Sequence, residues 1–219
     1  MHKPLAISMG EPAGVGPDIV LQLFSRRAEM ELPAFCLFGN IEFLQARAER
    51  LGLDVGLVEV SPEDAGAEFG ERLPVVQVDG PVSDSPGEPS PLSAHAVIDS
   101  ISKAVAATLQ GRCRGLVTAP IHKGVLYHAG FKHPGHTEFL AELCADGGLV
   151  LLPVMMLAHD DLRAVPVTIH VPLAQVPLLL TKALLVETVR IVCRDLQGRF
   201  GIAAPCIAVA GLNPHAGEG

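Results

Sequence analysis

The first 24 residues contain the feature that most restricts the fold. Leu5–Met9 is a short apolar run, the segment 10–18 (GEPAGVGPD) is rich in glycine, and Ile19–Phe24 has an apolar, helix-like pattern. A strand, a glycine-rich turn and a helix in this order open a βα unit. We therefore expect an α/β protein in which helices cover a parallel sheet.

The rest of the chain continues the alternation of strands and helices. Apolar runs predict strands at Phe35–Phe38, Gly115–Ala119, Leu149–Ala158, Ala164–Ile169 and Cys206–Ala210. Helical spacing predicts helices at Ile41–Arg50, Leu92–Leu109, Thr137–Cys144 and Pro177–Leu196, with Ser90 or Ser93 as the N-cap of the second. The segment 61–91 is rich in Pro, Gly, Ser and acidic residues, so it predicts a long surface excursion with at most a short strand at Leu73–Val78.

Composition excludes several classes of protein. The 219 residues are 49% hydrophobic, which is typical of a packed globular protein, and the net charge of −8 argues against nucleic acid as the main partner. No apolar run reaches the length of a membrane span, and the N-terminal residues lack the pattern of a signal peptide. The five widely spaced cysteines favour free thiols in a cytoplasmic protein over a zinc or redox site.

Polar motifs follow the predicted strands, and open α/β sheets bind ligands beyond the carboxyl ends of their strands. The turn Gly14–Gly16 offers backbone N–H groups to a phosphate, or is simply a tight βα turn that needs a positive φ. It is not the dinucleotide fingerprint, because Pro17 and Asp18 interrupt the required spacing. Lys123, just past a strand, is able to pair with a phosphate or carboxylate, although surface lysines are common.

Three histidines have positions that indicate substrate or metal binding. His136 stands before a predicted helix, where it could donate to an anionic or hydroxylated substrate, and Thr137 beside it is either an N-cap or a further substrate contact. His170 and His215 each follow a predicted strand, and neutral imidazole is the commonest protein metal ligand. Two such ligands supply half of a divalent-metal site, but a lone histidine is more often structural, so the spacing alone is only suggestive.

Together these motifs resemble those of the 4-hydroxythreonine-4-phosphate dehydrogenase family of pyridoxal phosphate biosynthesis. The matching segments occur in the family's order along the whole chain: Gly10–Asp18, Thr118–Gly124, Gly135–Phe139, Thr168–Leu173 and Gly211–Gly219. One such motif is weak evidence, whereas five in order are strong.

The resemblance implies a two-domain α/β/α architecture like that of isocitrate and isopropylmalate dehydrogenases, working as a homodimer. It implies that His170 and His215 bind one divalent metal (Zn, Mg or Co), and that His136 and Thr137 bind substrate. The implied reaction is NAD- or NADP-dependent oxidation of 4-phosphooxy-L-threonine, followed by decarboxylation to 3-amino-2-oxopropyl phosphate. Lys123 is assigned a catalytic, charge-supplying role from its position alone, and no cofactor-binding residue is identified.

The chain departs from the family by stopping at Gly219, inside a matching motif. Family members continue and supply a third metal-binding histidine. We therefore expect residues 1–130 to form a first domain completed by a missing segment, and residues 131–219 to form a truncated second domain. We expect this chain by itself to be inactive or impaired.

Two alternatives stay open. One is a paralogous dehydrogenase of a phosphorylated sugar acid or an aromatic dihydrodiol, and the other is an inactive fragment that binds a metal or ligand weakly.

Overall fold

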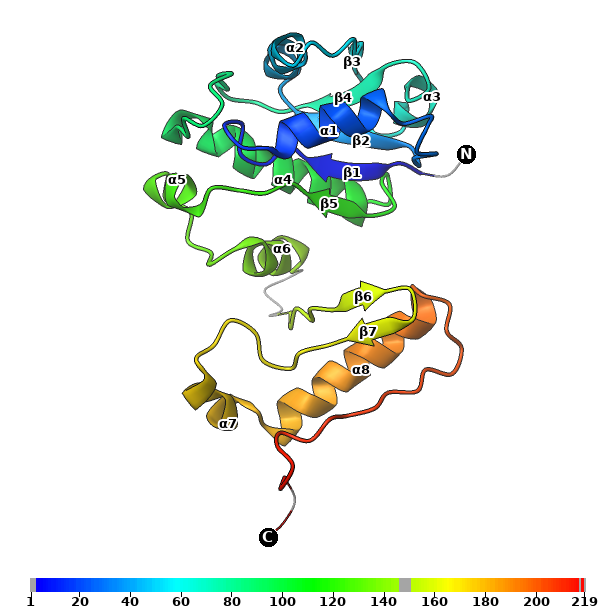
Figure 1. Cartoon of the computed structure of the whole chain (residues 1–219), viewed down its shortest axis with the longest axis vertical. Coiled ribbons are helices and arrows are strands. Elements are labelled where there is room, and N and C mark those ends of the chain that lie inside the picture. Colours follow the sequence, from blue (N-terminus) through cyan, green and yellow to red (C-terminus); the bar gives the residue numbers. More distant parts are fainter. Residues whose placement is uncertain (1–2, 146–150, 217, 219) are drawn as a thin grey trace. The chain divides into compact units, whose positions relative to one another are not determined.

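The computed structural model describes residues 3–145, 151–216 and 218, which fall into two compact units (Figure 1). Unit 1 covers Met1–Leu151 and unit 2 covers Leu152–Gly219. The division lies beyond the expected boundary at residue 130, because Phe131 and Phe139 belong to the hydrophobic core of unit 1. Whether these units are the domains of the whole protein stays a prediction.

Unit 1 is built on a five-stranded parallel sheet. Its strands are β1 (Leu5–Ser8), β2 (Phe35–Gly39), β3 (Leu57–Glu59), β4 (Leu73–Gln77) and β5 (Leu116–Thr118), in the spatial order β3-β4-β2-β1-β5. The register places Ile7 of β1 between Leu37 of β2 and Val117 of β5. Because all strands run the same way, the turns after β1, β2, β4 and β5 meet at one edge of the sheet.

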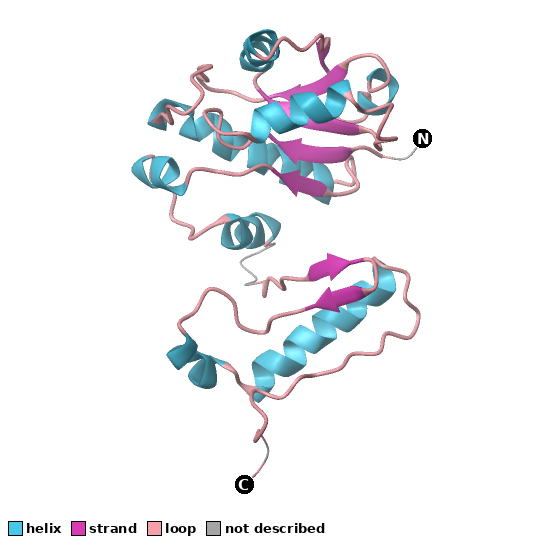
Figure 2. Ribbon diagram, in the orientation of Figure 1, coloured by secondary structure: helices cyan, strands magenta, loops and turns pink. Residues whose placement is uncertain are grey.

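Seven helical segments accompany this sheet (Figure 2): α1 (Gly16–Ser25), α2 (Ile41–Arg50), α3 (Ala65–Glu68), the 3-10 turn η1 (Pro91–Ser93), α4 (Ala94–Leu109), α5 (Lys123–His128) and α6 (His136–Cys144). α1 and α2 pack against each other, whereas α4 contacts β1, β2 and β5. α1 connects β1 to β2, toward the β3 edge of the sheet, whereas α4 connects β4 to β5, toward the opposite edge. Right-handed crossovers therefore place the two helices on opposite faces.

α4 anchors the centre of the sheet. Its buried face contains Ala96, Ala104 and Ala107, and these small side chains let the helix lie close to the strands. Between them the buried Ser100 donates its hydroxyl to the carbonyl of Phe38 (2.6 Å) and accepts from the N–H of Met9 (2.9 Å). This hydroxyl satisfies backbone groups just where β1 and β2 end, so it fixes the edge from which the functional motifs emerge.

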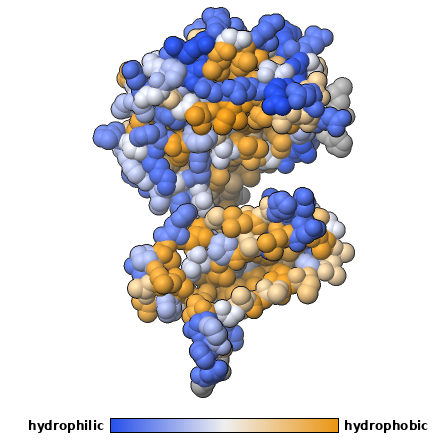
Figure 3. Space-filling model, viewed as in Figure 1, coloured by the Kyte–Doolittle hydropathy of each residue, from blue (hydrophilic) through white to orange (hydrophobic). Residues whose placement is uncertain are grey.

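Unit 2 is smaller and has little core of its own. It contains the antiparallel hairpin β6 (Leu157–His159) and β7 (Leu162–Ala164), the turn η2 (Leu173–Gln175), and the helices α7 (Val176–Leu179) and α8 (Lys182–Gly198). Its buried side chains among the described residues are Thr188, Val192 and Leu196 of α8. Apolar side chains cover much of its visible surface, and Leu173 and Leu178 are 85% and 80% exposed (Figure 3).

The expected elements are confirmed where the hydrophobic pattern is strong, which holds for β1, α1, β2, α2, α4, β5 and α6. The possible short strand at Leu73–Val78 is confirmed as β4, but its expected place in a surface excursion is wrong, because β4 pairs with both β2 and β3 inside the sheet. Leu73 and Val75 of this strand are fully buried.

Three expectations in unit 2 are wrong. The segment 165–169 is not a strand, because β7 ends at Ala164, and Cys206–Ala210 forms none. The long helix Pro177–Leu196 is two helices, since Thr181 is extended and accepts from the N–H of Leu184 to begin α8. The first half of the expected strand Leu149–Ala158 lies partly outside the described residues, and its described part forms a strand only from Leu157.

Candidate functional site

The glycine-rich turn after β1 packs tightly on the end of β5. Gly10 has φ +72°, and a Cβ there would lie 2.6 Å from the carbonyl oxygen of Pro120. Gly16 has no room either, because its Cβ would lie 2.9 Å from that of Ala119. The expected positive φ within Gly14–Gly16 is therefore wrong: Gly10 needs the left-handed conformation, and Gly16 is required by close approach. The Glu11 N–H donates to Pro120 (2.8 Å) and locks the two turns together.

A buried arginine holds the other end of this turn. Arg47 of α2 is 1% exposed, forms ion pairs with Asp18 and Asp84, and donates to the carbonyl of Pro12 at 2.6 Å. The turn after β1, the helix α2 and the segment after β4 thus share one ion-pair network. Because the buried Arg47 charge is compensated only by groups from these other segments, the network fixes the turn.

The turn after β5 leads into α5 and places Lys123. His122 is the N-cap of this helix, and its Nδ1 accepts from the N–H of Val125 at 3.1 Å. Lys123 follows as the first helical residue and is exposed. In the part of the chain that the structure describes, no carboxylate lies within ion-pair distance of Lys123, so its charge is available to a ligand.

The structure brings Lys123 to the N-terminus of α6. A Cβ added to Gly135 would lie 3.4 Å from the Lys123 Nζ, so the ammonium packs against this glycine. Gly135, rather than Thr137, is the N-cap, and no side chain caps the first turn that His136 and Thr137 begin. Uncapped N–H groups and an ammonium attract an anion here, while the Glu138 carboxylate of the same turn, whose Oε2 would lie 3.6 Å from that Cβ, opposes them in part. Three predicted site residues therefore lie in one cluster: Lys123, His136 and Thr137.

The protonation and hydrogen bonding of His136 depend on this environment. Burial lowers the pKa of its imidazole below the ordinary value, and the neighbouring Lys123 ammonium lowers the pKa further. Its Nε2 atom is buried and has no hydrogen-bond partner within the described structure. A neutral imidazole with one unengaged nitrogen can donate to or accept from a bound hydroxyl or anion.

The two predicted metal ligands lie in unit 2, and neither follows a strand directly. His170 occupies a bend beyond β7, is exposed, and has φ +54°, an unusual conformation for a residue with a side chain. His215 lies in an exposed turn fixed by the Asn213 Oδ1, which accepts from its N–H at 2.9 Å. Its Nδ1 lies 3.1 Å from the Glu218 Oε2. Among the described residues no three metal-ligating side chains come together.

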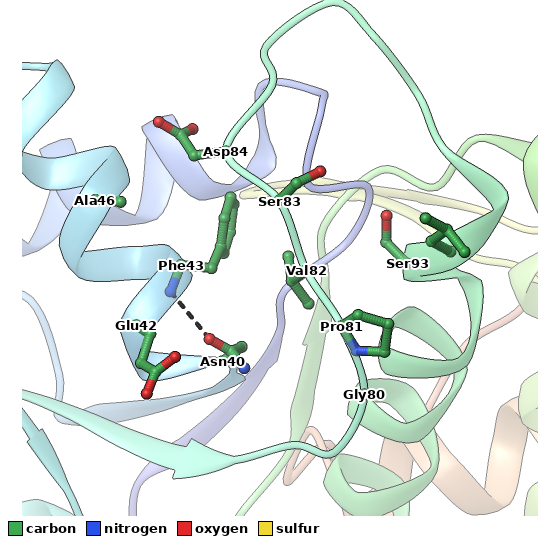
Figure 4. Close-up of a pocket in the computed structure, with 11 residues that line it drawn as sticks. Asn40, Glu42, Phe43, Ala46, Gly80, Pro81, Val82, Ser83, Asp84 and Ser93 are labelled. Carbon is green, nitrogen blue, oxygen red and sulfur yellow. Dashed lines mark hydrogen bonds between the residues drawn. The ribbon is translucent and has the colours of Figure 1, made fainter.

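One cavity lies at the same edge of the sheet and was not predicted (Figure 4). It measures about 440 Å³ and lies between the start of α2 and the segment after β4. Asn40 caps α2 on one wall, while Val82, Ser83 and Asp84 form the other. The only signal in the sequence was an asparagine directly after the strand Phe35–Gly39, and none of the predicted site residues lines this cavity.

A parallel sheet whose strands are followed by a glycine-rich turn, a lysine and an uncapped helix N-terminus defines a protein of the open α/β class. Residues 31–219 match the family described as "Pyridoxal phosphate biosynthetic protein PdxA". The chain belongs to this family.

Among the helices of the described residues, none has both the length and the apolar character that a membrane span requires.

Relatives with known names agree with this family. A protein of Bradyrhizobium diazoefficiens named 4-hydroxythreonine-4-phosphate dehydrogenase is 51% identical over 99% of this chain, and the chain spans 65% of its length. The solved structure of an enzyme of that name from Burkholderia phymatum has a TM-score of 0.83 at 28% identity, covering 100% of this chain and 65% of that one. The Klebsiella pneumoniae enzyme has a TM-score of 0.82 at 31% identity, covering 99% and 66%. The expected α/β architecture is confirmed by these neighbours.

Proposed function

We propose that the protein carrying this chain is an NAD(P)-dependent, divalent-metal-dependent 4-hydroxythreonine-4-phosphate dehydrogenase. It oxidises 4-phosphooxy-L-threonine, and loss of CO₂ then gives 3-amino-2-oxopropyl phosphate. The names of the relatives support this activity. Since the chain spans less than two thirds of their length, the activity belongs to the whole protein.

The cluster of Lys123, His136 and Thr137 is the observation that carries the proposal. Within the described residues it combines an ammonium that forms no ion pair, a helix N-terminus that no side chain caps, and an imidazole whose pKa is lowered, with the Glu138 carboxylate on the same first turn. A substrate bearing a phosphate and a carboxylate offers anions that such a site attracts. We assign Lys123 to charge stabilisation, and His136 and Thr137 to hydrogen bonds with the substrate.

The chemistry of His170 and His215 fits a divalent metal. The Glu218 carboxylate beside the His215 Nδ1 favours the tautomer that leaves Nε2 free, which is the usual arrangement behind a metal-binding histidine. His170 is exposed, so its imidazole is accessible. When bound, a divalent cation would favour ionisation of the substrate hydroxyl, and NAD(P) would accept the hydride.

The chain's own residues then bind and orient the substrate. Lys123 stabilises negative charge, and the first-turn N–H groups of α6 fix an anionic oxygen in place. His136, kept neutral by burial and by Lys123, is able to accept a proton or a hydrogen bond at its unengaged nitrogen. The identity of the metal and the preference between NAD and NADP are not assigned to any residue.

The activity is tested by following substrate-dependent NADH or NADPH formation by the whole protein. We expect Lys123→Met to lower kcat/KM by about 100-fold, the effect of removing one charge-stabilising donor. Lys132→Met is the matched control, because Lys132 is exposed and lies outside the cluster. Turnover of an unphosphorylated hydroxy acid or dihydrodiol, with none on the phosphorylated substrate, would overturn the assignment in favour of a paralogous dehydrogenase.

The metal site is tested separately by zinc titration. We expect His170→Ala and His215→Ala each to weaken zinc binding at least 10-fold, because each removes an imidazole ligand. His95→Ala is the control, since His95 lies on α4 in unit 1. Unchanged zinc affinity in both single variants would exclude these residues as ligands.

We also propose a homodimer in the cytoplasm. The resemblance to the family supports the homodimer, and the exposed apolar side chains of unit 2 offer a surface that a second copy or the rest of the whole protein would cover. The five free cysteines support a reducing compartment.

A further inference from the structure

Two cysteines that are distant in sequence meet inside unit 1. Cys36 lies in β2 and Cys113 in the connection between α4 and β5, and their Sγ atoms are 3.9 Å apart. Both side chains are buried free thiols. The fold alone brings them together, since 77 positions separate them along the chain.

The two thiols differ in acidity. The hydrogen bond with Cys36 lowers the pKa of Cys113, and the nearby Arg112 guanidinium lowers it further. The same contact with Cys113, together with burial, raises the pKa of Cys36. Cys113 is therefore the better source of thiolate, which is the nucleophilic form of cysteine.

Neighbouring backbone contacts hold both cysteines beside the start of β1. Cys36 is paired with Ala6 in the sheet, and the N–H of Arg114 donates to the carbonyl of Pro4 at 2.9 Å. Cys113 itself is buried, at 2% exposed, but it lies in a connection whose neighbouring residues Arg112 and Arg114 are half-exposed and exposed. A small neutral oxidant can reach it through a local opening of this connection.

We propose that Cys36 and Cys113 form a peroxide-sensitive modification site that closes into an intrachain disulfide. The Cys113 thiolate attacks one oxygen of hydrogen peroxide and becomes a sulfenic acid, and the other oxygen leaves as hydroxide and takes up a proton to form water. The Cys36 sulfur then attacks the Cys113 sulfur, the S–O bond breaks, and a second water leaves with the Cys36 proton. Two thiols are oxidised and one peroxide is reduced.

The site is separate from the proposed ligand edge. Cys36 lies near the amino end of β2 and Cys113 precedes β5, so both are at the edge of the sheet opposite the turns that carry Gly10 and Lys123. The crosslink restricts the unfolded chain, and we expect it to stabilise unit 1 without rearranging the anion cluster.

The test treats the reduced, purified protein with hydrogen peroxide, quenches it with acid, alkylates the remaining thiols after denaturation and maps the peptides by mass spectrometry. We expect a linked pair of peptides containing Cys36 and Cys113, reversal by dithiothreitol, and a rise in Tm of roughly 5 °C. Cys36→Ser and Cys113→Ser abolish the link and the rise. Cys193→Ser, which changes a half-buried thiol of α8, retains both.

Peptide mapping of the unmodified sequence decides the matter even if a serine variant does not fold. Recovery of both Cys36 and Cys113 as alkylated free thiols after peroxide would overturn the proposal. Oxidation of Cys113 to sulfinic or sulfonic acid without a link, or a link from Cys113 to a different cysteine, would overturn it equally.

Discussion

At the scale of single residues, His136 is the most informative side chain. Burial and the Lys123 ammonium both disfavour its charged form, so its pKa lies below the ordinary value of 6.5. The unfolded chain therefore binds this proton more readily than the folded protein does. The contribution of His136 to the free energy of unfolding is complete above pH 6.5 and decreases as the pH falls below that value.

Substitution of Lys123 separates the two causes of the lowered pKa of His136. We expect Lys123→Met to raise the pKa of His136, because the nearby positive charge is lost, but not to the ordinary value, because burial is the larger cause. An NMR pH titration of the imidazole measures this change. Lys132→Met serves as the control and leaves the titration unchanged, whereas an unaltered pKa in Lys123→Met would show that the two groups do not interact.

At the scale of elements, the contact between the turn after β1 and the end of β5 builds the ligand edge. Gly10→Ala introduces a Cβ that meets the Pro120 oxygen at 2.6 Å and the Ala119 Cβ at 2.8 Å. We expect a loss of about 3 kcal/mol in the free energy of unfolding, which combines backbone strain with overpacking. Urea denaturation of the purified protein measures it.

Gly52→Ala is the matched control for this prediction. Gly52 has φ +65°, close to that of Gly10, but nothing lies within 4 Å of an added Cβ. We expect it to cost only the backbone strain, about 1 kcal/mol. Equal losses in the two variants would mean that the contact with β5 contributes nothing to stability.

At the scale of the whole molecule, the proposed homodimer can be tested at the exposed apolar side chains of unit 2. We expect the whole protein to have twice the mass of one chain in light scattering after gel filtration. Leu178→Glu, at a side chain that is 80% exposed, should shift the equilibrium toward the monomer, because a desolvated carboxylate is costly at an apolar interface.

Leu109→Glu is the comparison for the dimer prediction. Leu109 is also exposed, at 60%, but it ends α4 in unit 1. We expect this variant to remain dimeric. A monomeric unmodified protein, or equal dissociation by both substitutions, would exclude an interface formed by unit 2.

The sequence predicted unit 1 better than unit 2, for a physical reason. In unit 1 each element buries a continuous apolar stretch, as Phe35–Gly39 does, so the local pattern and the tertiary environment agree. In unit 2 few of the described side chains are buried, and residues 165–169 and 206–210 have no neighbouring strand to pair with in the part of the chain that the structure describes. Hydrophobicity alone cannot make a strand without a partner for its backbone groups.

By itself the sequence determined the parallel α/β plan, because glycine-rich turns and buried strands follow from local sterics and apolar patterning. It identified Lys123, His136 and Thr137 as separate candidates. Only the tertiary structure decided that these three lie together, that Gly10 rather than Gly14 takes the left-handed turn, and that Cys36 touches Cys113. Contacts between distant segments depend on strand order and helix packing, which no local pattern encodes.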